Sequence, residues 1–251
     1  MQFRPSIVQT LILITLAAVF LQLGLWQLER KAEKEDLFER FEQAPSMGLS
    51  QALSAERPFT LVTAFGRYDP ERHILLDNKI WQGRAGVHVL TPFRLEGGPT
   101  LLVNRGWLPM PADRSRLPEV PTAGGPRELR GRLAPPPVPG QRLGAPDMLT
   151  TTEWPQLMTY FDLPDVAAAL GNELEPWLVL LDAEDPSGFG DRQWSPATMG
   201  PDVHGGYAVQ WLALMVTAIV IWGLLGLRRG EQLRGERRVL ETGDHTGGTS
   251  R

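Results

Sequence analysis

Residues 7–26 read IVQTLILITLAAVFLQLGLW, and residues 207–227 read YAVQWLALMVTAIVIWGLLGL. Neither stretch contains a charged residue. A helix needs about 20 mainly apolar residues to cross the hydrocarbon core of a bilayer, and each stretch meets that length. Nearly all of the polar sequence lies between them. The sequence therefore predicts a membrane protein in which transmembrane helices at residues 7–27 and 207–227 flank one loop domain.

The first stretch differs from a cleaved signal peptide. A signal-peptide core has roughly 7–15 apolar residues, whereas the run from Ile7 to Trp26 is longer. No small-x-small cleavage site follows the run, and the chain continues into QLERK at residues 27–31, which favours helix. We therefore expect the first stretch to remain in the protein as an uncleaved anchor.

Basic residues near the two spans bear on the orientation of the chain. Five arginines follow the second span: Arg228, Arg229, Arg234, Arg237 and Arg238. Clustered arginine next to a span marks the cytoplasmic side, which places both termini in the cytoplasm and the domain outside. Basic residues between Arg30 and Arg40 follow the first span and argue for the opposite orientation. Long loops cross the membrane largely regardless of charge, so we predict an extracytoplasmic domain.

The composition of the chain narrows the function classes. Residues 28–203 are long enough for one ordinary domain with its own core. The net charge of −4 does not indicate nucleic-acid binding, which needs a basic patch. The absence of cysteine excludes disulfides, thiolate metal sites and cysteine nucleophiles. Soft sulfur ligands select Cu(I), so copper delivery is not indicated either.

Alternating apolar and β-branched residues indicate a mainly β domain. Strands are predicted at residues 60–68, 73–78, 87–95, 100–107, 127–133 and 177–182. Turns are predicted at residues 69–70, 78–79 and 97–99. Residues 29–41 keep helical spacing and extend the first span, and residues 165–170 form a short helix that Gly171 ends. The domain is expected to be a barrel or a sandwich with short helices.

Two segments favour irregular structure. Residues 109–146 are dense in proline, and proline is excluded from central strands, so we expect extended chain on the surface. This segment is either a long connecting loop or a docking face for another protein. Glycine, threonine and serine dominate after Val239, and residues 228–251 are expected to form a basic, disordered cytoplasmic tail.

Motifs of the common enzyme classes are missing from the sequence. It contains no G-x-S-x-G, H-E-x-x-H or G-x-x-x-x-G-K-S/T pattern. We therefore predict no enzyme activity and assign no catalytic residue. His73 and His88 lie in separate predicted strands, and because a metal site needs three or four ligands they are interpreted as ordinary strand residues. The acidic residues at 182, 184 and 185 are interpreted as a solvated strand end.

The second span begins with HGGY at residues 204–207. His204, Tyr207 or Ala208, and Trp211 follow i, i+3/i+4, i+7 spacing and share one helix face, although the two glycines place His204 just outside the regular helix. Neutral histidine is the usual proximal ligand of haem iron, and a helix N-terminus favours that neutral form. The glycines leave room for a flat macrocycle on which Trp211 would stack. His204 is therefore a candidate metal ligand.

The exit of the first span must lie at the same bilayer face. Trp26 and Gln27 are expected at the depth where the second span begins, and Arg30 and Lys34 lie one and two turns farther out. These cations would pair with carboxylates such as haem propionates. A general alternative explains the same residues, because Trp and Tyr form an aromatic belt at membrane interfaces and Lys and Arg extend their charges there. From these residues alone the belt is the simpler interpretation.

Five motifs follow one another along the chain. They are LGLWQL-x-R-x-x-x-K at 23–34, LDNK at 76–79, G-x-x-GV-x-VLTP at 83–92, LVNRGWLP at 102–109 and H-x-x-YA-x-QW at 204–211. In this order, with two spans that bracket one domain, the chain resembles the surfeit-locus family of cytochrome c oxidase assembly factors. It departs from that family at residues 201–203, which read PDV where members often carry asparagine before the histidine.

The resemblance implies a function and a site. It implies a bacterial inner-membrane protein with a periplasmic domain, a haem chaperone that helps to assemble the haem-copper terminal oxidase. Haem a would be the cofactor, with the oxidase catalytic subunit and other assembly factors as partners. By this resemblance His204 is the metal ligand. The full candidate cofactor site comprises His204, Tyr207, Trp211, Trp26, Gln27, Arg30 and Lys34.

The NRGW motif at residues 104–107 has its own physical interpretation. Gly106 indicates a β-bulge or a positive φ. Arg105 either is buried and paired inside the domain or faces the membrane helices, and Trp107 would pack beneath it. The motif lacks a nucleophile–base pair, so we predict a structural role.

Two functions therefore remain open. The first is an assembly factor that holds haem a at the periplasmic membrane face and aids its insertion into the oxidase catalytic subunit. The second is a cofactor-free membrane scaffold that stabilises oxidase subunits during assembly. The two differ in whether His204 is needed for haem to be retained.

Overall fold

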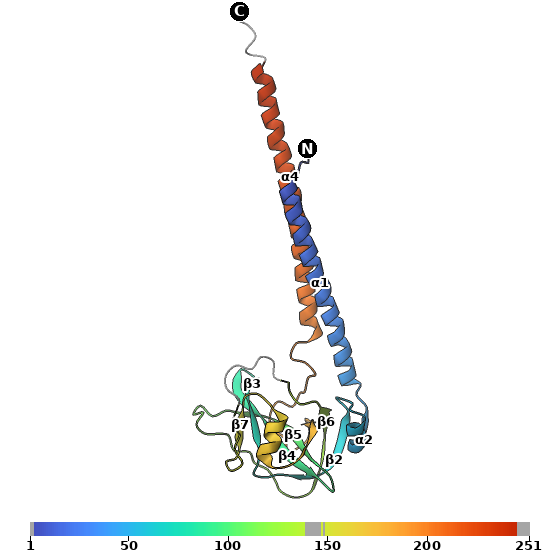
Figure 1. Cartoon of the computed structure of the whole chain (residues 1–251), viewed down its shortest axis with the longest axis vertical. Coiled ribbons are helices and arrows are strands. Elements are labelled where there is room, and N and C mark those ends of the chain that lie inside the picture. Colours follow the sequence, from blue (N-terminus) through green and yellow to red (C-terminus); the bar gives the residue numbers. More distant parts are fainter. Residues whose placement is uncertain (1–2, 139–146, 148, 245–251) are drawn as a thin grey trace, which may run out of the picture. The chain divides into compact units, whose positions relative to one another are not determined.

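The computed structural model describes residues 3–138, 147 and 149–244, with backbone alone over 236–244. It divides into two compact units (Figure 1). One is a helical unit built from the chain up to Glu39 and from Ala197 onward. The other is the β-rich domain Arg40–Pro196. Each unit is described by itself.

The helical unit consists of α1 (Ile7–Glu42) and α4 (Pro201–Asp244). Trp222 Nε1 donates a hydrogen bond of 3.1 Å to Thr10 Oγ1. The rings of Phe20 and Trp211 lie 5.9 Å apart. Thr10 thus contacts Trp222, whereas Phe20, later in α1, contacts Trp211, which is earlier in α4. The two helices therefore run antiparallel. The end of the first apolar stretch therefore lies beside the start of the second.

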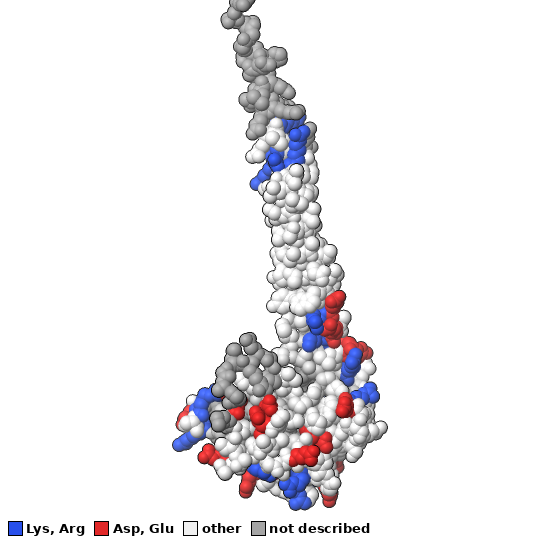
Figure 2. Space-filling model, viewed as in Figure 1, with Lys and Arg blue, Asp and Glu red and all other residues white. Residues whose placement is uncertain are grey.

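Both helices are long and apolar enough to cross a bilayer. Only 6% of the apolar window of each is buried, so most of these side chains face outward rather than into a protein core. Figure 2 shows the middle of this unit free of Lys, Arg, Asp and Glu. The predicted fold class is confirmed: the chain is a membrane protein with two transmembrane helices that flank a mainly β domain.

Two expectations about α4 are wrong. His204 lies inside the first turn, because the helix begins at Pro201. Proline suits the first helical position, and Asp202 in the first turn favours the helix dipole. The predicted disordered tail is helical as far as Asp244, because glutamate, leucine, glutamine and arginine are strong helix formers. Residues 245–251 of that prediction lie outside the described residues.

The domain contains the following strands and helices, in chain order: β1 (Ser46–Gly48), α2 (Leu49–Ser54), β2 (Leu61–Tyr68), β3 (Ile74–Trp81), β4 (Arg84–Leu95), β5 (Thr100–Pro109), β6 (Arg127–Ala134), β7 (Gln156–Met158), α3 (Leu163–Leu170) and β8 (Leu174–Leu181). All six predicted strands and the predicted short helix are confirmed. The three-residue strands β1 and β7 and the helix α2 are not predicted. The turn expected at residues 78–79 is wrong: Asn78 lies in an irregularity within β3, and the turn falls at Gln82 and Gly83.

Five of the strands close into a barrel. The order is β2–β6–β8–β5–β4, and β4 returns to β2 through the pairing of Gly66–Tyr68 with Phe93–Leu95. The first part of the same β4 edge pairs with β3. Pro92 lies where β4 changes partner, a place where a missing backbone N–H is tolerated. The domain is therefore a small barrel rather than a sandwich.

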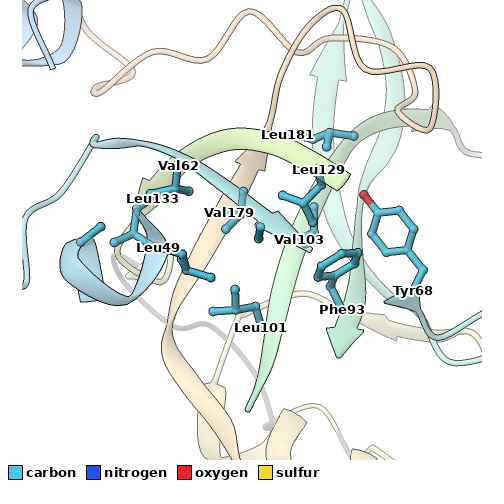
Figure 3. Close-up of a cluster of buried hydrophobic side chains, with 12 residues drawn as sticks. Leu49, Val62, Tyr68, Phe93, Leu101, Val103, Leu129, Leu133, Val179 and Leu181 are labelled. Carbon is cyan, nitrogen blue, oxygen red and sulfur yellow. The ribbon is translucent and has the colours of Figure 1, made fainter. Parts of the chain in front are cut away.

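The barrel interior is filled by alternating residues of its strands (Figure 3). Val62, Ala64 and Tyr68 point inward from β2, and Leu49 of α2 packs against this cluster. At the third inward position of β2, a Cβ on Gly66 would lie 2.2 Å from the Arg94 carbonyl oxygen. Glycine is required there because the two backbones approach closely where the barrel closes.

Two further apolar clusters lie outside the barrel. One joins α3 to β3, β4 and β5. Asp162 caps the N-terminus of α3. Gly171, with a φ of 63°, ends the helix, as the sequence predicts. In the other cluster, Met110, Leu117 and Val120 pack against β3 and β4. Within the proline-dense segment, the residues before β6 are thus irregular but held in place. The expectation of irregular surface chain is wrong for β6 itself, which is a barrel strand. Residues 139–146 of the segment lie outside the described residues.

Candidate functional site

A side-chain hydrogen bond joins the two span mouths, which are the end of the first apolar stretch and the start of the second. His204 Nδ1 lies 2.9 Å from Gln27 Oε1. Gln27 is only 9% exposed, although it belongs to a helix whose apolar side chains face outward. The sequence predicts that these two residues lie at the same depth, and the structure brings them into direct contact.

This hydrogen bond determines where the imidazole proton lies. An amide oxygen can only accept a hydrogen bond, so Nδ1 of His204 must donate. In a neutral imidazole the lone pair is then on Nε2. Within the described part of the chain, Nε2 has no hydrogen-bond partner. A histidine held through one nitrogen with the other available is the usual arrangement of a metal-binding histidine.

Small residues allow the helices to approach closely around this bond. Ala208 is 1% exposed. A Cβ on Gly24 would lie 3.2 Å from Leu212 Cδ2, and a Cβ on Gly205 would lie 3.4 Å from Lys31 Cδ. Small residues at helix–helix contacts in membranes serve this purpose.

Lys31 is a site residue that the sequence analysis missed. Its side chain lies against Gly205, next to His204, and its Nζ is 3.4 Å from Glu35 Oε1. The signal that would have found it is the helical spacing of Phe20, Gly24 and Gln27, which continues at residue 31. Lys34, which was predicted, lies two turns from Gln27 and is partly exposed.

Two other predicted residues lie together on the outer surface of α1. Trp26 is 44% exposed. The guanidinium carbon of Arg30 lies 6.0 Å from the centre of its ring. Arg30 also forms a 2.5 Å ion pair with Glu33, which compensates part of its charge.

The predicted aromatic residues of α4 differ in their surroundings. Tyr207 is 46% exposed. Trp211 is partly buried and stacks on Phe20 of α1, with 26° between the ring planes. The shared face of His204, Ala208 and Trp211 is confirmed by their contacts with α1.

The two histidines of the domain, His73 just before β3 and His88 in β4, each form hydrogen bonds within the domain. His73 Nδ1 lies 3.0 Å from Thr91 Oγ1, and its Nε2 lies 3.2 Å from the Pro70 carbonyl oxygen. His88 Nδ1 lies 3.3 Å from Asn104 Nδ2. Burial lowers the pKa of each to about 4. Among the described residues, no group of three or more potential ligands lies close enough to hold a metal ion.

The acidic residues after β8 form a turn, which confirms their interpretation as a strand end. Asp182 Oδ1 accepts a 2.8 Å hydrogen bond from the Glu184 backbone N–H. Asp185 Oδ1 accepts hydrogen bonds from the backbone N–H and the hydroxyl of Ser187, at 2.8 and 2.6 Å.

The NRGW motif forms a β-bulge. Between the pairs His88–Trp107 and Leu90–Asn104, one residue of β4, Val89, lies opposite two residues of β5, Arg105 and Gly106. Gly106 has a φ of 102°, as the sequence predicts. Trp107 Nε1 donates to the Lys79 carbonyl at 3.0 Å. Arg105 is 2% exposed, so of the two alternatives left open by the sequence the structure shows burial within the domain.

Comparison with known proteins shows the family to which this chain belongs. A model of the SURF1 family matches residues 14–216, which include most of the first span, the first ten residues of the second and the whole domain. The chain belongs to the SURF1 family. An uncharacterised SURF1-like protein of Mycobacterium tuberculosis is 26% identical over 231 residues, which cover 87% of this chain and 81% of the relative.

Similar relatives occur in other organisms. A SURF1-like protein of Monosiga brevicollis is 25% identical over 238 residues and 88% of each chain. One of Rickettsia felis is 26% identical over 223 residues, which cover 84% of this chain and 94% of the relative. Membership of the SURF1 family, a family of assembly factors rather than known enzymes, suggests a role in cytochrome oxidase assembly.

Proposed function

We propose that this chain is a haem-binding assembly factor of the haem-copper terminal oxidase. It holds haem a at the periplasmic membrane face and aids its insertion into the catalytic subunit. The observation that carries the proposal is the hydrogen bond between Gln27 and His204. It joins the two span mouths and leaves one imidazole nitrogen available as a ligand.

The residues at the span mouths fit a haem. His204 would supply Nε2 to the iron, and Gln27 would hold the ring through Nδ1. A Cβ added to Gly206 would meet no atom within 4 Å, so the helix surface beside the ligand has room for a flat group. The exposed rings of Trp26 and Tyr207 would provide apolar contact area. When bound, haem a supplies the iron centre that the oxidase requires.

Basic side chains at the same level would hold the propionates. Lys31 reaches across to Gly205, and Arg30 and Lys34 extend from the same helix. Charge-assisted hydrogen bonds from such groups to carboxylates are the strong ones. The acidic partners of Arg30 and Lys31 lie on their own helix at i+3 and i+4, so both cations can exchange partners without changing the helix.

The proposed location is a bacterial inner membrane with both termini in the cytoplasm. Arg228, Arg229 and Arg234 follow the apolar part of α4 and are exposed. Clustered arginine at a span end favours the cytoplasmic side. The domain and the span mouths with His204 would then face the periplasm. Reporter fusions at each terminus and within residues 110–126 test this orientation.

The role is one of binding rather than catalysis, and the partners would be the oxidase catalytic subunit and other assembly factors. The alternative function is a cofactor-free scaffold. A scaffold would be purified without haem, while oxidase subunits would still co-purify with it.

The test is the absorption spectrum of the detergent-purified chain from cells that make haem a. Wild type is expected to carry or accept haem, and His204→Ala is expected to lose it. His245→Ala removes the other histidine of the C-terminal segment and serves as the matched control. Full occupancy and an unchanged spectrum in His204→Ala would overturn the ligand assignment, and a haem-free wild type would favour the scaffold.

A further inference from the structure

A second candidate site lies in the β domain, where two arginines share one aromatic ring. The guanidinium carbons of Arg105 and Arg127 lie 4.8 and 5.4 Å from the ring centre of Tyr68. Tyr68 belongs to the barrel core (Figure 3). The arginines come from β5 and β6, which are not neighbours in the sheet. The fold therefore brings two positive charges together at the rim of an apolar core.

Arg105 is fully occupied by neutral acceptors. Its Nε and Nη2 donate to the Ser187 carbonyl oxygen at 2.9 and 2.6 Å. Its Nη1 donates to Thr122 Oγ1 at 2.6 Å, and Nη2 also donates to the Pro121 carbonyl at 3.2 Å. Burial, together with the nearby charge of Arg127, lowers the pKa of Arg105 to about 10. Arg105 thus contributes positive charge to this place without a carboxylate in direct contact.

Arg127, unlike Arg105, has a side-chain donor that lacks a hydrogen-bond acceptor. Its Nε is buried and has no hydrogen-bond partner, the only such side-chain atom among the described residues. Its Nη2 lies 3.6 Å from Asp185 Oδ1, too far for a hydrogen bond. That same oxygen already accepts two hydrogen bonds from Ser187. Asp185 therefore forms only a long ion pair with Arg127, and the Arg127 Nε–H has no acceptor among the described residues.

Both arginines line one cleft of about 760 Å³. Thr122, Ser187 and Phe189 also line it. The two guanidiniums and the single Asp185 carboxylate leave a net positive charge in partly desolvated surroundings. Guanidinium presents parallel N–H donors that match the oxygens of carboxylate or phosphate. A buried donor without a partner in a native structure calls for an explanation, and a bound ion is one of the few.

We propose that this cleft binds an oxyanion, the carboxylate or phosphate group of a small ligand, and that Arg127 is its principal donor. Arg105 assists through its charge and keeps the cleft wall in place. The ligand enters between residues 121–123 and 186–189, which line the cleft. This site is built from the β domain alone and is independent of the haem proposal.

The experiment measures the ³¹P linewidth of inorganic phosphate with the full-length chain in detergent, at constant ionic strength with chloride. Phosphate is expected to broaden with wild type. Arg127→Gln is expected to weaken binding at least tenfold, and Arg127→Lys, which keeps the charge but loses the parallel donors, to give an intermediate loss. Arg130→Gln is the matched control, because Arg130 lies on the same strand, is exposed and pairs with Glu128.

Acetate as a competitor distinguishes the two sources of the oxyanion. If acetate narrows the phosphate signal in wild type, the cleft accepts carboxylates as well; if it does not, the cleft prefers phosphate. Binding that is equal in wild type and Arg127→Gln would overturn the proposal, as would no broadening by wild type in the absence of acetate. If Arg127→Gln does not fold, Arg127→Lys and the competition in wild type still decide the outcome.

Discussion

Gln27 and His204 are separated by 177 positions in the sequence, and their side chains form a hydrogen bond of 2.9 Å. The bond joins two helices of opposite direction at the ends where they leave the apolar region. It fixes the orientation of an imidazole and the nitrogen that carries its proton. The candidate haem site is thus a property of the helix pair and does not exist on either helix alone.

Replacing the partner of the imidazole should weaken haem binding without removing the ligand. In Gln27→Leu, the ring loses the acceptor that orients it, and residues with this supporting role typically contribute 10–100-fold to metal affinity. We expect a loss of roughly that size in a haem titration followed by absorbance. Gln22→Leu, an exposed position on the same helix, should bind as wild type does. Equal affinity in Gln27→Leu would show that the hydrogen bond has no part in binding.

The close approach of the helices should depend on Gly24. A larger side chain would have to displace Leu212, whose Cδ2 is 3.2 Å from the position of a new Cβ. Overpacking of this kind costs about 1–3 kcal/mol. Gly24→Leu should therefore lower the thermal midpoint of the detergent-solubilised chain and reduce haem retention. Gly223→Leu, where a Cβ meets no atom within 4 Å, should do neither.

The sequence predicts the spans and the strands because their signals are local. Apolar length identifies α1 and α4, and alternation identifies strands such as β2, whose burial alternates residue by residue. The closure of the barrel is not a local property. It depends on Gly66 meeting Arg94 and on β4 changing its partner near Pro92, and no short pattern encodes that pairing.

The candidate site shows the same division. His204 and Gln27 are recognised from their depth at the span ends. Depth does not determine which side of a helix faces the partner helix. The sequence therefore predicts Arg30 as a site residue, whereas the structure places Lys31 against Gly205. No sequence pattern indicates Arg127 as a site residue. Its Nε–H lacks a hydrogen-bond acceptor only in the folded domain, where β5, β6 and the segment after β8 come together.

The stability of the domain should increase with pH between about 4 and 6.5. His73 and His88 have pKa values of about 4 in the folded chain, below the unfolded value of about 6.5. The unfolded state therefore binds more protons in this window, and the stabilisation present above it is lost as pH falls towards 4. Each histidine contributes up to about 3 kcal/mol.

Proton NMR of the histidine ring signals checks this directly. The chain has four histidines, so their signals can be separated and assigned by substitution. The signals of His73 and His88 should remain those of neutral imidazole down to about pH 5. Titration of either near pH 6.5 would contradict the expectation, and the increase of unfolding free energy with pH would then have another origin.

Barrel closure should fail when Gly66 gains a side chain. The new Cβ of Gly66→Ala would lie 2.2 Å from the Arg94 carbonyl oxygen and 2.7 Å from the Phe93 ring, so the backbones of β2 and β4 would have to separate at the closing pair. We expect a loss of about 3 kcal/mol or more in the free energy of unfolding, measured by denaturation in detergent with tryptophan fluorescence. Gly48→Ala, with a φ of −60° and open space around the Cβ, should change it by less than about 0.5 kcal/mol. A Gly66→Ala chain as stable as wild type would mean that β2 and β4 do not close the barrel through this pair.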